Sequence, residues 1–112
     1  MMTKSKYRNK KTEVDGLTFD SKAEATRYLQ LKMLERSGHI NDLKLQVPFE
    51  LAPSVVIKGR KRPAMKYVAD FVYEVSGKNV VEDCKGMVTA IYSAKRHLMK
   101  SVHGIDILET RA

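Results

Sequence analysis

Two neighbouring apolar segments, each interrupted by acids, constrain this chain more than any other feature. Residues 67–73 alternate apolar side chains on one face with a second set that contains a single acid, Asp70, which predicts a β-strand. Ser76-Gly77-Lys78-Asn79 predicts a tight turn, so residues 80–85 should form an antiparallel partner strand. Alternation on that strand places Val81, Asp83 and Lys85 on one face and Val80, Glu82 and Cys84 on the other.

Two acids and a lysine on adjacent strands suit metal-assisted cleavage of a phosphodiester. Two carboxylates can hold Mg²⁺, while a lysine can orient or help to deprotonate the attacking water. The alternative is structural: Asp70 accepts hydrogen bonds at a strand end, and Asp83 forms a surface ion pair with Lys85. Buried carboxylates are costly unless they are paired or bound to metal, so the apolar surroundings of both acids favour the site.

The arrangement of Asp70 followed by Asp83-Cys84-Lys85 resembles the active-site motif of the PD-(D/E)xK nuclease superfamily. Ala69 stands where the family often has proline, and Asp83 replaces the commoner glutamate, with Glu82 beside it as a rival acid. The resemblance covers about residues 17–108 and is closest to small phage or prophage nucleases, including junction-resolving enzymes. It implies an α/β fold with a restriction-endonuclease-like core, a mixed, mainly antiparallel central sheet flanked by two helices.

The resemblance also implies roles for particular residues. Asp70 and Asp83 would bind Mg²⁺, for which Mn²⁺ can substitute, and Lys85 would assist the nucleophile. The backbone carbonyl of Cys84 would complete the metal shell, and Glu24 would add a ligand or position water.

Glu24 has two interpretations that the sequence leaves open. Ser21 predicts the N-cap of a helix that runs to about Arg36, with Gly38 as its stop. Three residues after the cap, the Glu24 carboxylate can bond back to the Ser21 amide in a capping box. Glu24 also shares a helical line with Tyr28 and Leu31, four and seven positions on, which would turn it toward the sheet.

Charge and composition indicate the class of partner. The chain has 112 residues, enough for one domain, which we place at 12–112 after a flexible basic arm at 1–11. Its 21 Lys+Arg against 13 Asp+Glu give a net charge of +8, which favours nucleic acid. The sequence has neither a membrane span nor a signal-peptide core, so we expect no membrane partner and a cytoplasmic protein. A single cysteine excludes an intramolecular disulfide.

The remaining segments have predicted structures of their own. Residues 12–19 predict a hairpin around Asp15-Gly16, and residues 43–51 a strand that Pro48 places at an edge or a bulge. A short strand at 55–57 and a basic loop at 59–63 follow, and the predicted phosphate contacts there are Lys58, Arg60, Lys61 and Arg62. Ile105 and Ile107 predict a closing strand.

A second helix is predicted over residues 88–103. Its core stripe should consist of Ile91, Ala94, Leu98 and Val102. A different face carries Tyr92, Lys95, Arg96, Met99 and His103, and the predicted nucleic-acid contacts on it are Tyr92, Lys95 and Arg96.

These observations favour a Mg²⁺-dependent DNA endonuclease, with duplex DNA or branched, Holliday-junction-like DNA from phage recombination or replication as its substrate. The alternatives are a non-catalytic nucleic-acid-binding module, such as a subunit of a recombination or packaging complex, and a scaffold for protein contacts. One such site hydrolyses one strand at a time, so we expect a homodimer. Its contact would be the edge strand 43–51 or the Tyr92 and Met99 face.

Overall fold

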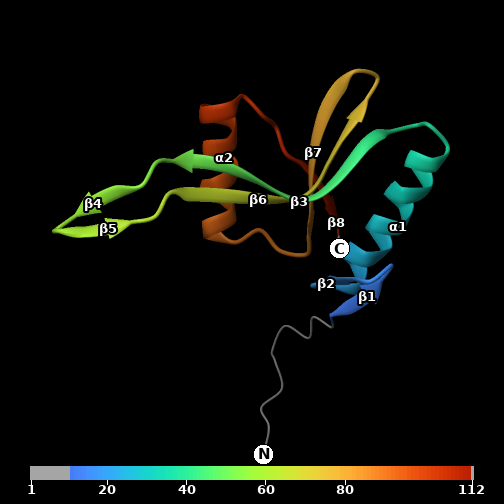
Figure 1. The fold of residues 1–112 in the computed structure, drawn as a ribbon, viewed down its shortest axis with the longest axis horizontal. Helices are drawn as coiled ribbons and strands as arrows, with labels where there is room; N and C mark the ends of the chain where they lie inside the picture. The colour runs from blue at the N-terminus through green and yellow to red at the C-terminus, as the bar shows by residue number, and fades with distance from the viewer. Residues whose placement is uncertain (1–10, 112) are drawn as a thin grey trace, which may run out of the picture.

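A computed structural model describes residues 11–111 of the chain, and Figure 1 shows its ten elements. They are β1 (Thr12–Val14), β2 (Leu17–Phe19), α1 (Lys22–Arg36), β3 (Asn41–Ala52), β4 (Val55–Ile57), β5 (Arg60–Arg62), β6 (Met65–Val75), β7 (Lys78–Lys85), α2 (Ala90–His103) and β8 (Leu108–Arg111). The predicted basic arm, apart from Lys11, lies outside the described residues. Neither helix has the length and apolar character needed to cross a membrane.

The central sheet has the strand order β3-β6-β7-β8. β3 pairs with β6 and β6 with β7 in antiparallel register, whereas β7 and β8 are parallel. The chain is therefore α/β with a mixed, mainly antiparallel sheet, as predicted. β3 lies at the edge of this sheet, in agreement with Pro48, but its register shifts occur near Asn41 and Glu50 and not at the proline.

Three two-residue turns connect the hairpins, and each ends in glycine. Ser76 and Gly77 have φ angles of 51° and 79°, the left-handed pair that a type I′ turn requires. Lys78 and Asn79, predicted within the turn, therefore belong to β7. Lys58 and Gly59 form a similar turn, with φ angles of 51° and 77°. The predicted loop at 59–63 is consequently wrong, because Arg60–Arg62 pair with β4 as the strand β5.

Two hydrophobic clusters cover opposite faces of β7, because the consecutive residues Val80 and Val81 pack into different ones. The first lies under α1 and contains Phe19, Ala25, Tyr28, Leu31, Ile40, Phe71 and Tyr73. The second lies under α2 and contains Leu51, Tyr67, Ala69, Val81, Tyr92 and Met99.

Of the predicted core stripe of α2, Leu98 packs against the second cluster, but Ile91, Ala94 and Val102 are exposed. Tyr92 and Met99 are the buried residues of this helix, whereas Ile91 is 72% exposed and Val102 is 51% exposed. The Tyr92 hydroxyl donates to the Glu109 carboxylate at 2.6 Å, so the tyrosine can bury its ring and still satisfy its polar end. Because Tyr92 and Met99 fill the core, they cannot form the predicted dimer contact.

The predicted closing strand also begins too early. Ile105 and Ile107 pack against the α2 cluster without forming a strand, and β8 starts at Leu108. Residues 109–111 continue this strand and pair with residues 83–85 of β7.

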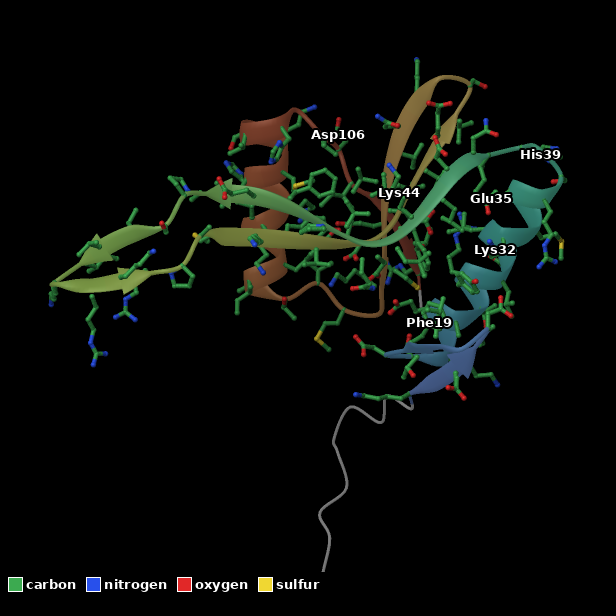
Figure 2. All side chains as sticks on the ribbon, viewed as in Figure 1. Phe19, Lys32, Glu35, His39, Lys44 and Asp106 are labelled. Carbon is green, nitrogen blue, oxygen red and sulfur yellow. The ribbon has the colours of Figure 1, made fainter. Side chains whose placement is uncertain are left out.

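Polar contacts at both ends of α1 fix this helix to the sheet and to the first hairpin. At its start, Ser21 Oγ caps the helix by accepting the Glu24 amide, and the Tyr28 hydroxyl donates to Asp15 at 3.1 Å. Near its end, the Glu35 carboxylate accepts from Lys32 on the same helix (Figure 2) and from the Leu43 amide of β3.

Glu82 on β7 is fully buried and is the centre of a network that joins four elements. Arg27 of α1 donates to both of its carboxylate oxygens, at 2.6 and 3.0 Å. Tyr73 of β6 donates at 2.5 Å and Thr110 of β8 at 3.1 Å. A buried charge with this many partners is satisfied, and the cost of its burial is offset only while the partners remain.

We expect Arg27→Met to destabilise the fold by about 3 kcal/mol, because it leaves the Glu82 charge buried without its cation. Lys100→Met is the matched control: Lys100 pairs with Asp106 at 2.8 Å, but both side chains are more than half exposed, so its loss should cost less than about 1 kcal/mol. Urea unfolding of the two variants measures both values. Equal costs would show that the Glu82 network does not hold the fold.

Candidate active site

Asp70 and Asp83 lie on adjacent strands, next to the paired residues Phe71 and Glu82. Asp83 is buried, with 2% exposure, and Asp70 is partly buried. Burial, followed by the hydrogen bond and the charge of Asp83, raises the pKa of Asp70 to about 8. Asp70 Oδ2 also accepts the Cys84 amide at 2.9 Å, which opposes that rise in pKa. Asp70 therefore keeps its proton near neutral pH, beside the Asp83 carboxyl group.

Asp83 is not fully satisfied. Its buried Oδ2 has no hydrogen-bond partner among residues 11–111, and neither has the buried hydroxyl of Tyr67. Lys85 Nζ lies 3.1 Å from the same oxygen, an ion-pair distance whose geometry does not make a hydrogen bond. Burial, with the charge of Asp83 next, raises the pKa of Tyr67. An acid with an unbonded oxygen beside a lysine can accept a further ligand.

Lys85 is positioned by the two groups that flank it. Its ammonium pairs with Asp83 and lies 4.4 Å from the centroid of the Tyr92 ring, which attracts cations. Tyr92 is buried, so its ring supports Lys85 from within the core and is not the exposed nucleic-acid contact that was predicted. Arg96 pairs with Glu109 at 2.9 Å and is only partly exposed, while Lys95 is also partly exposed on α2.

Glu24 points toward the sheet and is 7% exposed. Its amide bonds to Ser21 as in a capping box, but its carboxylate lies 3.5 Å from Gln46 Nε2 of β3. Burial, and then the charges of Asp20 and Asp83, raise the pKa of Glu24. The carboxylate is therefore within the electrostatic field of the acid pair, and a pocket of about 460 Å³ opens beside it between β2 and β3.

Gln46 is a site residue that the sequence did not reveal. Its φ of 53° is in the left-handed region, which is unfavourable for a non-glycine residue inside a strand. The register of β3 and β6 places it opposite Asp70, between the pairs Leu45 with Phe71 and Val47 with Ala69. In the sequence, Gln46 looks like any outward residue of an alternating strand, so nothing there marks it.

The rival acids of β7 lie on opposite faces. Asp83 lies beside Asp70 and Lys85, whereas Glu82 bonds to Arg27, Tyr73 and Thr110. Cys84 contributes its amide to Asp70, and burial raises the pKa of its thiol. The alternation predicted for this strand is confirmed.

Among residues 11–111, no group of three His, Cys, Asp or Glu side chains is arranged to hold a metal ion. Asp70 and Asp83 nevertheless fit Mg²⁺, which is commonly held by one or two carboxylates and several waters. The Oδ2 of Asp83, which has no hydrogen-bond partner among these residues, and the adjacent Asp70 carboxyl group mark the position that a cation would take. Glu24 is near enough to act on both acids electrostatically and belongs to the outer part of the site.

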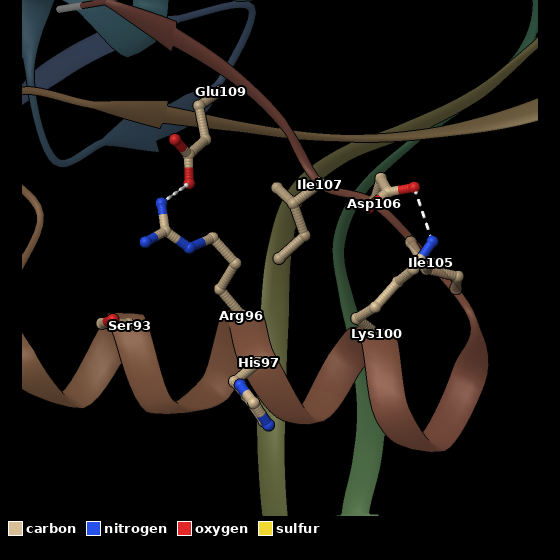
Figure 3. Close-up of a pocket in the computed structure, with 8 residues that line it drawn as sticks. All are labelled: Ser93, Arg96, His97, Lys100, Ile105, Asp106, Ile107 and Glu109. Carbon is tan, nitrogen blue, oxygen red and sulfur yellow. Dashed lines mark hydrogen bonds and ion pairs between the residues drawn. The ribbon is translucent and has the colours of Figure 1, made fainter.

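A different pocket, of about 360 Å³, lies between α2 and the segment that leads into β8 (Figure 3). The charged side chains that line it are paired with each other, Arg96 with Glu109 and Lys100 with Asp106. With its charges already compensated, it is a weaker candidate than the acid pair.

The chain belongs to the family described as "Protein of unknown function (DUF1064)", whose model matches residues 4–106. No curated protein matches the chain. No solved structure matches it either.

In metal-free buffer we expect Asp70→Asn to stabilise the protein, and the gain should grow between about pH 4 and pH 8. The folded state keeps the Asp70 proton up to about pH 8, whereas the unfolded chain releases it near its ordinary pKa of 3.8. Stability from this proton is therefore present at low pH and lost as pH rises, and asparagine removes that loss. Thermal unfolding across this pH range tests it, with the exposed Asp106→Asn as control; a gain independent of pH would contradict the raised pKa of Asp70.

Proposed function

We propose that this DUF1064 protein is a metal-dependent endodeoxyribonuclease with a restriction-endonuclease-like core. The observation that supports this most is the buried pair of Asp70 and Asp83, with an unbonded carboxylate oxygen and Lys85 beside it. A purely structural role would require both acids to be satisfied, as Glu82 is, but the buried Oδ2 of Asp83 has no hydrogen-bond partner among residues 11–111. Duplex and branched DNA, such as phage recombination produces, are both candidate substrates.

In this proposal Asp70 and Asp83 would hold Mg²⁺ or Mn²⁺, the Cys84 carbonyl would be a further ligand, and Glu24 would position a water molecule. When bound, the metal ion would neutralise phosphate charge and lower the pKa of a coordinated water. Lys85, held by Asp83 and the ring of Tyr92, is placed to orient the attacking water or to donate to the phosphate. Burial of the acids keeps bulk water from screening these charges.

The second candidate is a nucleic-acid-binding module without catalysis, part of a recombination or packaging complex. It is favoured by the lack of a three-acid group among the described residues. The two candidates differ in whether the acid pair is needed, because a module that only binds phosphates gains nothing from two buried carboxylates. A homodimer remains part of the proposal, and the edge strand β3 is the contact that the fold leaves available.

We expect Asp70→Asn and Asp83→Asn each to reduce cleavage of supercoiled plasmid in Mg²⁺ by at least about a hundredfold while both variants remain folded. The matched control is Glu82→Gln, which changes the neighbouring acid on the opposite face and should keep most activity in the fraction that is folded. Circular dichroism shows whether each variant is folded. Activity near the wild-type level in either Asn variant would remove that acid from the mechanism.

Lys85→Ala should cut poorly but bind DNA almost normally, because one cation among 21 Lys+Arg contributes little of the phosphate attraction. The measurements are single-turnover cleavage and fluorescence anisotropy with the same duplex. Lys95→Ala is the control for loss of one positive charge nearby. Proportional losses of binding and cleavage in Lys85→Ala would make Lys85 an ordinary phosphate contact.

A further inference from the structure

The hairpin of β4 and β5 is exposed along its whole length. Every residue from 53 to 63 is exposed, and in Figure 1 the hairpin projects past α2 at the end of the sheet. Its strands pair only with each other. The radius of gyration is accordingly 16.3 Å, against about 13 Å for a compact chain of this length. A two-stranded hairpin alone is marginally stable in water, so this one is suited to an external partner.

The composition of the hairpin indicates the chemistry of that partner. Each cross-strand pair joins an apolar residue of β4 to a basic residue of β5, so that Val55, Val56 and Ile57 oppose Arg62, Lys61 and Arg60. Lys58 adds a fourth cation at the turn, and residues 53–66 contain no acid. All of these cations are exposed, and none has an ion-pair partner in the described part of the chain. The hairpin therefore presents concentrated, uncompensated positive charge on an extended ribbon.

We infer that the β4–β5 hairpin lies in a groove of duplex DNA, at a distance from the acid pair. The major groove of B-form DNA, about 12 Å wide, admits a two-stranded β-ribbon. The deep, narrow major groove of A-form RNA does not. In this arrangement Arg60, Lys61 and Arg62 contact phosphates, and the apolar side chains of β4 contact sugars and thymine methyl groups. The inference rests on the proposed function in one respect: it places the cleaved bond at the acid pair.

The strands β5 and β6 set the distance between the tip of the hairpin and the acid pair. They run from the turn to Asp70, and eleven residue steps separate Gly59 from Asp70. At about 3.3 Å per residue this is at most about 36 Å. At about 3.4 Å per base pair the hairpin would contact the duplex up to roughly ten base pairs, or one helical turn, from the acids. The substrate is thus a duplex that extends about one turn to one side of the site.

A second copy of the chain is a less favourable occupant. Each copy has a net charge of +8, so packing a strand of three cations against another copy opposes like charges. The apolar strand β4 alone offers only three side chains for a protein contact.

The experiment compares two triple variants that lose the same charge. Arg60→Gln/Lys61→Gln/Arg62→Gln removes the cations of β5, and Lys22→Gln/Arg36→Gln/Lys78→Gln removes three exposed cations from other elements. Fluorescence anisotropy in EDTA measures binding to DNA duplexes of about 8 and about 24 base pairs and to an RNA duplex of about 24, over a range of salt. Thermal unfolding and light scattering of both variants monitor fold and oligomeric state.

On the long DNA duplex we expect the hairpin variant to bind at least about tenfold more weakly than the control, with a salt slope lower by about 3. On the short DNA duplex and on the RNA the two variants should bind alike. Equal binding to the long DNA would overturn the inference, and so would a hairpin variant that changes only its oligomeric state, which would assign the hairpin to a second copy. Because binding is measured without metal, a protein that binds in this way but never cleaves DNA would refute the nuclease and leave the hairpin contact standing.

Discussion

The rest of the fold depends on one buried ion pair, Arg27 with Glu82. Glu82 is fully buried on β7, and its carboxylate accepts hydrogen bonds from α1, β6 and β8 at once. A carboxylate in this position would destabilise the sheet without those donors, because burial costs several kcal/mol per unpaired ion. Both the position of α1 and the parallel pairing of β8 with β7 are therefore coupled to this single side chain.

The next residue along β7 shows the opposite condition. Asp83 is as buried as Glu82, but it faces Asp70, and one of its oxygens has no hydrogen-bond partner among residues 11–111. Both of these consecutive acids are thus removed from water, but hydrogen bonds satisfy the carboxylate oxygens of Glu82 alone. Because native structures rarely leave a buried polar atom unbonded, this contrast distinguishes the acid of the candidate site from the acid of the fold.

The sequence predicts β3, β6 and the faces of β7 well, because alternation is a local signal, but it predicts a loop where β5 forms and starts the closing strand too early. Asp83 could be assigned to the face of Lys85 in this way, and Glu82 to the other. The faces of α2 could not be predicted, because Ile91 and Val102 are as apolar as Tyr92 and Met99, and the Glu109 carboxylate that accepts from the buried Tyr92 hydroxyl lies outside the helix. The role of Gln46 could not be predicted, because its place opposite Asp70 depends on the pairing of β3 with β6, which is distant in the sequence.

The ion pair and the candidate site are connected through α1 as well as through β7. Glu24 and Arg27 are three residues apart and so lie on one face of the helix. The bond from Arg27 to Glu82 therefore holds Glu24 near Asp83, while Ser21 and Gln46 fix the amide and the carboxylate of Glu24 at either end. A shift of α1 along the sheet would break the network of Glu82 and move Glu24 in the same step. The position of Glu24 beside the acid pair is thus set by the interaction that stabilises the fold, whereas Asp70 and Asp83 are positioned by the pairing of β6 with β7.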